Sequence, residues 1–150
     1  MISLEEIQQR ILKGEEIENI IKDINWQEFE DLVSSIFREH DFDVFQNFRF
    51  KTESRYEVDL LSTKNNLIYA VDCKQWNRGR YKKTAIKNSV GKQMKRVKEL
   101  KKVLIGENIR IIPLLITLFE EDIIEHENVW IVPVWKLNEF LLDDEAQSDV

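Results

Sequence analysis

Apolar residues in the first forty positions recur every three or four residues, which is the spacing of one face of an α-helix. A first helix is expected to open at the capping-box pattern Ser3-Leu4-Glu5-Glu6 and can break at Gly14. A second is expected from the Asn25 cap to about His40. Its apolar arc contains Trp26, Phe29, Val33, Ile36 and Phe37.

The apolar period changes to two after residue 42, which indicates β-strands. Strands are expected over residues 42–51, 58–63 and 67–73, with a turn at residues 64–66. The first should carry Val44, Gln46, Phe48 and Phe50 on one face. The third is mostly apolar, as in a central strand buried on both sides.

The second half of the chain alternates between helical and strand patterns. A loop over 75–83 leads to a long helix over 84–105, which Gly106 should close. A strand over 109–117 contains Pro113, which favours an edge or a bulge. An acidic helical turn at 118–127, a strand at 129–132 and a helix at 135–142 complete the pattern. The long helix is long enough for a parallel crossover between strands.

This order predicts an α/β fold with an αβββαβ core, in which helices flank a mixed central sheet. A length of 150 residues suits one domain. We expect a helical extension at 1–24, the main domain at 25–142 and an acidic tail at 143–150. The first helix has no chemical signature and suits packing or dimer formation.

The composition, with 43% hydrophobic and 33% charged residues, is typical of a soluble globular protein. No apolar run is long enough to span a bilayer, and the acidic N-terminus is unlike a signal peptide. The single cysteine, Cys73, excludes an intrachain disulfide and a cysteine-based zinc cluster. A cytoplasmic location is therefore expected.

The net charge of −6 conceals an uneven distribution. The segment from Lys74 to Lys102 holds 12 lysines and arginines and only one acid, Glu99, whereas the rest of the chain is strongly acidic. Local charge, and not net charge, decides where a polyanion docks. The basic segment is therefore a candidate DNA-binding surface, although a lysine-rich helix face is by default only solvated.

Two carboxylates and an ammonium group lie close together in the predicted hairpin over 57–74. Asp59 is on its first strand, and Asp72 and Lys74 are two residues apart near the end of its second, on one face. Two carboxylates and a backbone carbonyl, such as that of Cys73, suit Mg²⁺. A lysine can hold a phosphate or an attacking water. A salt-bridged strand end explains the same pattern equally well.

Two further residues fall at the margins of apolar faces. Glu30 lies beside the apolar arc of the second helix, where an ordinary boundary glutamate is the simpler interpretation. Gln93 lies on the buried stripe of the long helix, next to Met94, which would have filled that position without a polar group.

In this order, Phe29-Glu30, Val58-Asp59, Asp72-Cys73-Lys74 and Gln93 resemble the motifs of the PD-(D/E)xK nuclease superfamily. The resemblance runs from about residue 26 to 116. It is greatest to the Mrr-like restriction endonucleases, relatives of archaeal Holliday junction resolvases, because Trp76 follows the lysine as it often does in that branch.

The resemblance implies a Mg²⁺-dependent DNA endonuclease, in which Mn²⁺ can replace Mg²⁺. It implies Asp59, Asp72 and Cys73 as metal ligands, Lys74 as catalytic, and Glu30 and Gln93 as supporting residues. A homodimer is expected, since two sites related by a two-fold axis cut both strands most simply. The expected DNA contacts are Trp76, Arg78, Arg80, Tyr81, Lys82, Lys83, Lys87, Lys92 and Lys95.

The chain departs from the family pattern in three places. Val58 replaces the usual proline, and Asp72 stands where the Mrr branch often has glutamine and the resolvases have glutamate. The arginine-lysine-glycine opening of resolvases does not precede Glu30, which favours duplex cleavage over junction resolution. The alternatives are a Holliday junction resolvase or other structure-specific nuclease, and a non-catalytic DNA-binding module on the same fold.

Overall fold

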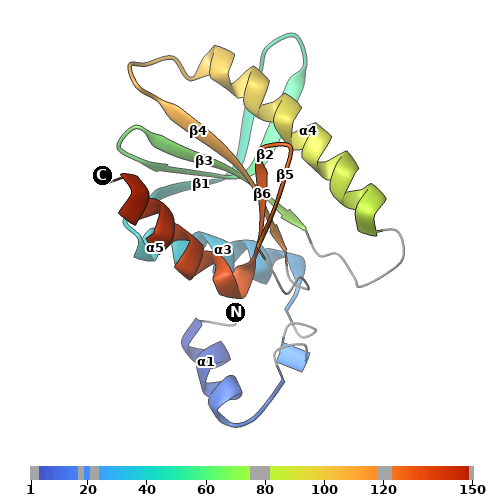
Figure 1. Cartoon of the computed structure of the whole chain (residues 1–150), viewed down its shortest axis with the longest axis vertical. Coiled ribbons are helices and arrows are strands. Elements are labelled where there is room, and N and C mark those ends of the chain that lie inside the picture. Colours follow the sequence, from blue (N-terminus) through green and yellow to red (C-terminus); the bar gives the residue numbers. More distant parts are fainter. Residues whose placement is uncertain (1–3, 17–18, 21–23, 75–81, 118–122, 149–150) are drawn as a thin grey trace.

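A computed structural model describes residues 4–16, 19–20, 24–74, 82–117 and 123–148. In these residues a six-stranded sheet lies between helices on both faces (Figure 1). The helical elements are α1 (Leu4–Leu12), α3 (Trp26–Glu39), α4 (Lys82–Val103), the 3-10 turn η1 (Val134–Lys136) and α5 (Leu137–Ser148). The strands are β1 (Asp43–Lys51), β2 (Arg55–Lys64), β3 (Leu67–Lys74), β4 (Arg110–Thr117), β5 (Ile124–His126) and β6 (Val129–Pro133).

The sheet has the strand order β1-β2-β3-β4-β6-β5. The first three strands form an antiparallel meander, and α4 then carries the chain to β4, which is parallel to both β3 and β6. The predicted mixed sheet in an αβββαβ core is thereby confirmed. One of its two central strands is β3, as the mostly apolar run of that strand indicated.

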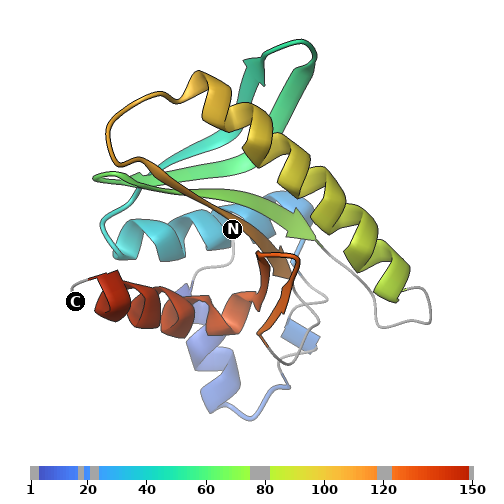
Figure 2. The same ribbon diagram turned by 45° about the horizontal axis from the view of Figure 1, so that its top comes forward.

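The core has two layers, one on each face of the sheet (Figure 2). On one face, α3 and α5 pack on β2, β3, β4 and β6, with Phe29 and Phe37 fully buried. On the other face, α4 contributes Val97 and Leu100 to a second cluster. Each fully buried side chain of this size contributes about 1.5–3 kcal/mol. These two layers fix the positions of α3 and α4 relative to the strand ends.

The start of α3 follows the predicted cap. The Asn25 side chain accepts a hydrogen bond from the Glu28 amide at 2.8 Å, and its own amide group donates to the Glu28 carboxylate at 2.9 Å. The apolar arc is buried as expected, except at Trp26, which is 42% exposed. Trp26 is the first residue of the helix, where the turn that would cover it has not yet formed.

The β1–β2 hairpin bends at Asn47. Asn47 has a positive φ of 54°, and no pairing joins it to Asp59, although the ladder has the same register on both sides. Phe48 and Phe50 consequently pack in the α4 cluster, whereas Val44 packs on the α3 side. The predicted common face for these residues is therefore wrong, because a simple period of two does not continue through a left-handed residue.

Two boundaries around α4 and β4 differ slightly from expectation. The helix ends at Val103, before the predicted stop at Gly106. Pro113 lies in a strand with neighbours on both sides, but β6 pairs with β4 only from Leu114 onwards. Pro113 therefore occupies a stretch of β4 that is unpaired on its β6 side, where a missing N–H has no ladder partner to lose.

The C-terminal third contains two larger differences. A helical turn is expected from the sequence over 118–127, but Ile124–His126 is the strand β5, and residues 118–122 lie outside the described part. Glu127 and Asn128, both with positive φ, connect β5 to β6 in the type I′ pattern. In addition, α5 continues six residues past the predicted end at Leu142, and Asp144 accepts a hydrogen bond from the Tyr69 hydroxyl.

Candidate active site

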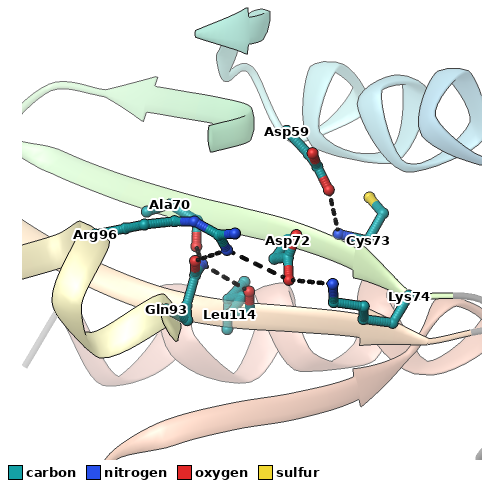
Figure 3. Close-up of polar contacts among 8 residues, drawn as sticks. All are labelled: Asp59, Ala70, Asp72, Cys73, Lys74, Gln93, Arg96 and Leu114. Carbon is teal, nitrogen blue, oxygen red and sulfur yellow. Dashed lines mark hydrogen bonds and ion pairs between the residues drawn. The ribbon is translucent and has the colours of Figure 1, made fainter. Parts of the chain in front are cut away.

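Asp59 of β2 and Asp72 of β3 lie next to each other (Figure 3). Leu60 pairs with Val71 in the antiparallel ladder, so the next positions outward are those of the two aspartates. Pairing of β1 with β2 is interrupted at Asn47 and Asp59, and pairing of β2 with β3 ends at Leu60 and Val71, so Asp59 lies where the β2–β3 ladder stops. The sequence prediction that these carboxylates meet at one end of the hairpin is consistent with this placement.

Asp72 forms ion pairs with two cations although its side chain is only 7% exposed. Its Oδ2 lies 3.2 Å from Lys74 Nζ and 3.5 Å from Arg96 Nη1. Neither contact has the alignment of a hydrogen bond, so Oδ2 is a buried oxygen without a hydrogen-bond partner among the described residues. A buried carboxylate oxygen in this position is open to a further positive ligand.

Asp59 is held by the backbone of the neighbouring strand. Its Oδ2 accepts a hydrogen bond from the Cys73 amide at 2.9 Å. Burial and the adjacent Asp72 carboxyl raise the pKa of Asp59 to about 7, and the Cys73 amide only partly offsets this rise. A cation bound beside Asp59 would lower this pKa, because it would favour the ionised form of the carboxyl group.

Cys73 itself points into the core between the sheet and α3. Its side chain is fully buried, and burial raises the pKa of the thiol well above its usual range. The thiol is therefore an inert apolar group. The backbone amide of Cys73 contacts Asp59, and the role of its carbonyl as a metal ligand stays a prediction.

Glu30 lies on α3 and is 4% exposed. Burial raises the pKa of this carboxyl group, and a hydrogen bond from the Trp26 side chain lowers it in part. Asp31, Glu57 and Asp72 add smaller electrostatic contributions that raise the pKa further. Glu30 is therefore electrostatically coupled to the two aspartates, which a boundary glutamate on a solvated helix face would not be.

Gln93 is fully buried and bridges two central strands. Its Nε2 donates to the Ala70 carbonyl at 2.7 Å and to the Leu114 carbonyl at 3.1 Å. Its Oε1 accepts from Arg96 Nη1 at 3.2 Å. Both donor hydrogens are thus used within the protein, and the side chain joins β3, β4 and Arg96 beneath Asp72.

Arg96 and Trp26 are two side chains at the site that the sequence does not predict there. Arg96 is one helical turn after Gln93, on the same face of α4, and a lone arginine among lysines is its only signal in the sequence. The helical period predicts that Trp26 lies in the core. In the structure it is 42% exposed and its side chain forms a hydrogen bond with Glu30 instead.

The predicted DNA-contact residues are placed only in part. Four of them lie outside the described residues, namely Trp76, Arg78, Arg80 and Tyr81. Lys82 and Lys83 form the first turn of α4, but their side chains are not described. Lys87, Lys92 and Lys95 are exposed on α4.

The residues present are compatible with a hard divalent ion. No group of three histidine, cysteine, aspartate or glutamate side chains is arranged to hold a metal among the described residues. Mg²⁺ does not require one, because it usually takes one or two protein carboxylates and keeps its remaining waters. Asp59, Asp72 and the Cys73 carbonyl are hard oxygen donors, and Asp72 Oδ2, which has ion pairs but no hydrogen bond among the described residues, fits this role.

The family model described as Restriction endonuclease, Mrr_cat, matches residues 21–114. The chain belongs to this restriction endonuclease family. The resemblance expected from the motifs is therefore confirmed, and the five candidate site residues all fall within the matched segment. Membership makes this a nuclease domain of the restriction-endonuclease superfamily, for which DNA is the implied substrate.

Two further proteins are similar to this chain. An uncharacterized protein from Archaeoglobus fulgidus is 32% identical over 119 residues, which cover 79% of this chain and 90% of that relative. The crystal structure of AF1548, a protein of unknown function, is similar over 76% of this chain, with a TM-score of 0.48 and 17% identity. The chain spans 63% of the length of that structure. None of the described helices is long and apolar enough to cross a bilayer.

Proposed function

We propose that this protein is a Mg²⁺-dependent DNA endonuclease of the Mrr type, with Mn²⁺ able to replace Mg²⁺. The proposal is carried by one observation, the meeting of Asp59 and Asp72 in a largely buried setting beside Lys74. Two carboxylates this close are unfavourable for folding alone and favourable for binding a divalent cation.

In this proposal Asp59, Asp72 and the Cys73 carbonyl hold the ion. When bound, the ion neutralises phosphate charge and lowers the pKa of water. Lys74 would then leave its ion pair with Asp72 and orient the phosphate or the attacking water. Only 30% of the Lys74 side chain is exposed, so little rotamer freedom is lost when it does so.

The remaining side chains act as supports. Arg96 and Gln93 fix the position of Asp72 through one connected set of contacts. Glu30, whose pKa is raised mainly by burial and which also senses the charge of Asp72, would supply a further carboxyl group to the site. The exposed lysines of α4 and the 75–83 segment would bind the DNA backbone, and a homodimer would cut both strands.

The test is cleavage of supercoiled plasmid DNA with Mg²⁺ or Mn²⁺ by wild type, Asp72→Asn and Lys74→Ala. Asp143→Asn and Lys13→Ala are matched controls, since both residues are exposed and distant in sequence from the site. We expect both site variants to lose on the order of 10³-fold in rate and both controls to retain the wild-type rate. Wild-type cleavage by Asp72→Asn or Lys74→Ala would show the assignment to be wrong.

The same preparations separate the alternatives. A four-way junction and a linear duplex with identical arms are compared as substrates, and we expect no strong preference for the junction. Strong preference would identify a resolvase. Binding without cleavage under both metals would identify a non-catalytic DNA-binding module.

A further inference from the structure

Beyond the bend at Asn47, the β1–β2 hairpin forms an arm, residues 48–58, that projects past the end of the central sheet (Figures 1 and 2). One face of the arm is aromatic and packs over the C-terminal half of α4. Phe50 and Val58 are buried there with Val97 and Leu100. Phe50 also stacks on Tyr56, with ring centroids 5.4 Å apart.

The tip of the arm is also fixed to α4 by a polar contact. The Thr52 hydroxyl donates to the Glu99 carboxylate at 2.7 Å. This hydrogen bond and one from Lys102 lower the pKa of Glu99, which therefore stays ionised and able to accept both. The arm is thus held on α4 by its apolar face and by the contact at its tip. Its other face therefore points away from α4.

That other face carries three exposed cations, Arg49, Lys51 and Arg55. Lys51 and Arg55 are direct cross-strand partners, and Arg49 is the partner of Glu57. Side chains of paired residues emerge on the same face, about 4.5–5.5 Å apart at Cβ. The three cations therefore form one compact group, defined here as the arm cations.

The arm cations are poorly neutralised. Arg49 lies 3.5 Å from Glu57 but is 79% exposed, so this ion pair is weak. No ion pair joins Lys51 or Arg55 to a carboxylate in the described part of the chain. Like charges opposite one another destabilise a β-hairpin. An anion bound between the two side chains would relieve this repulsion.

The arm cations border a surface hollow. The hollow is lined by Arg49, Phe50, Lys51, Arg55, Tyr56 and Glu57. Glu57 lies near enough to Glu30 to contribute to the raised pKa of that carboxyl group. In β2, Asp59 is only two positions beyond Glu57, which corresponds to about 6.6–6.8 Å along a strand. A polyanion bound along the arm would therefore pass close to the candidate site.

We propose that the arm cations bind the phosphate backbone of duplex DNA next to the candidate active site, as a contact separate from the lysines of α4. This inference rests on the proposed function. Residues two apart on a strand are separated by about 6.6–6.8 Å, so Arg49 and Lys51 can reach neighbouring phosphates of one DNA strand. The contact is electrostatic and independent of base sequence.

The test is the binding of a fluorescent 30-base-pair duplex, without metal, over a range of salt concentrations. The arm variant is Arg49→Gln, Lys51→Gln, Arg55→Gln, and the matched control is Lys13→Gln, Arg38→Gln, Arg110→Gln, which removes three exposed cations elsewhere. We expect the arm variant to bind at least about tenfold more weakly at low salt. The slope of log Kd against log salt should fall by about 3, because three phosphates are then no longer neutralised by the protein.

A second measurement excludes a folding explanation. Replacing Lys51 and Arg55 removes a repulsive cross-strand pair, so the Tm of the arm variant should equal or exceed that of wild type. The charge-preserving variant Lys51→Arg, Arg55→Lys should bind like wild type. Wild-type affinity and salt slope in the arm variant, or an equal loss in the control, would overturn the proposal.

The readout does not depend on cleavage. If the arm variant binds normally while Asp72→Asn abolishes plasmid cleavage, the arm contact is wrong and the nuclease assignment stands. If wild type binds the duplex through the arm but cuts nothing, the nuclease assignment is wrong and the arm contact stands.

Discussion

Charged side chains occur in two contrasting regions, the end of β2 and β3 and the outer face of α4. In the first region Asp59, Asp72 and Arg96 are mostly buried and within a few ångströms of another charge. In the second, Lys87, Lys92 and Lys95 are exposed to solvent. The first region pairs carboxylates with cations at short distance and away from water, whereas the second holds charges of one sign in solvent.

That difference determines how each region should respond to substitution. Electrostatic interactions between buried neighbours are strong and mutually dependent, whereas exposed charges on a helix interact weakly and are screened by salt. Substitutions at the strand end should therefore have large effects that depend on one another. Substitutions on the outer face of α4 should have small effects that add.

The largest expected effect is the loss of cleavage when the Asp72–Lys74 pair is changed. Each single alanine variant should lose on the order of 10³-fold in rate, and the double variant should lose little more than either one. Groups that act as a unit give this strong non-additivity. A double-variant loss equal to the product of the single losses would show that the two residues act independently.

The second effect is on stability and concerns the support beneath Asp72. Gln93→Ala removes the donor from two buried carbonyls, of Ala70 and Leu114, and leaves a cavity. The free energy of unfolding, measured with urea, should fall by about 2–4 kcal/mol. Met94→Ala is the matched control on the neighbouring, 41% exposed position, and should change it by less than about 1 kcal/mol.

The residues that these two experiments address could be predicted from the sequence. The Asp59, Asp72 and Lys74 grouping follows from a short antiparallel hairpin, in which a period of two and a tight turn fix the neighbours. The buried position of Gln93 follows from its place on an apolar helix stripe. Both inferences use local geometry only, and this is why they agree with the fold.

Other features depend on how elements pack and could not be derived from a local pattern. The contact of Arg96 with Asp72 requires the rotation of α4 relative to β3. The left-handed conformation of Asn47 exchanges the faces of the β1–β2 hairpin, and no residue pattern marks it strongly. The part of α5 beyond Leu142 includes Asp144, which bonds to Tyr69, and that contact joins residues far apart in the chain.

The third effect is the pH dependence of stability that Asp59 confers. Its pKa of about 7 in the folded protein exceeds the ordinary value of 3.8, so the folded state holds the proton more tightly than the unfolded chain. Stability therefore falls as pH rises between these values and stays low above the folded pKa. Without metal, the Tm of wild type should fall by roughly 2–4 °C more than that of Asp59→Asn between pH 5 and 8.

Metal should reverse this trend. Mg²⁺ binds the ionised carboxylates in competition with protons, so it should raise the Tm of wild type more at pH 8 than at pH 5. Asp59→Asn should show a much smaller response to Mg²⁺ at either pH. Parallel pH curves for wild type and Asp59→Asn would contradict the coupling between Asp59 and Asp72.

The smallest effect is expected on the outer face of α4. Lys92→Gln and Lys95→Gln should each weaken duplex binding only about two- to threefold at 150 mM salt, because each removes at most one screened phosphate contact. The double variant should show the product of the two losses, and both losses should shrink as salt rises. Strong non-additivity here would mean that these lysines act together as the strand-end charges do, and the contrast between the two regions would no longer hold.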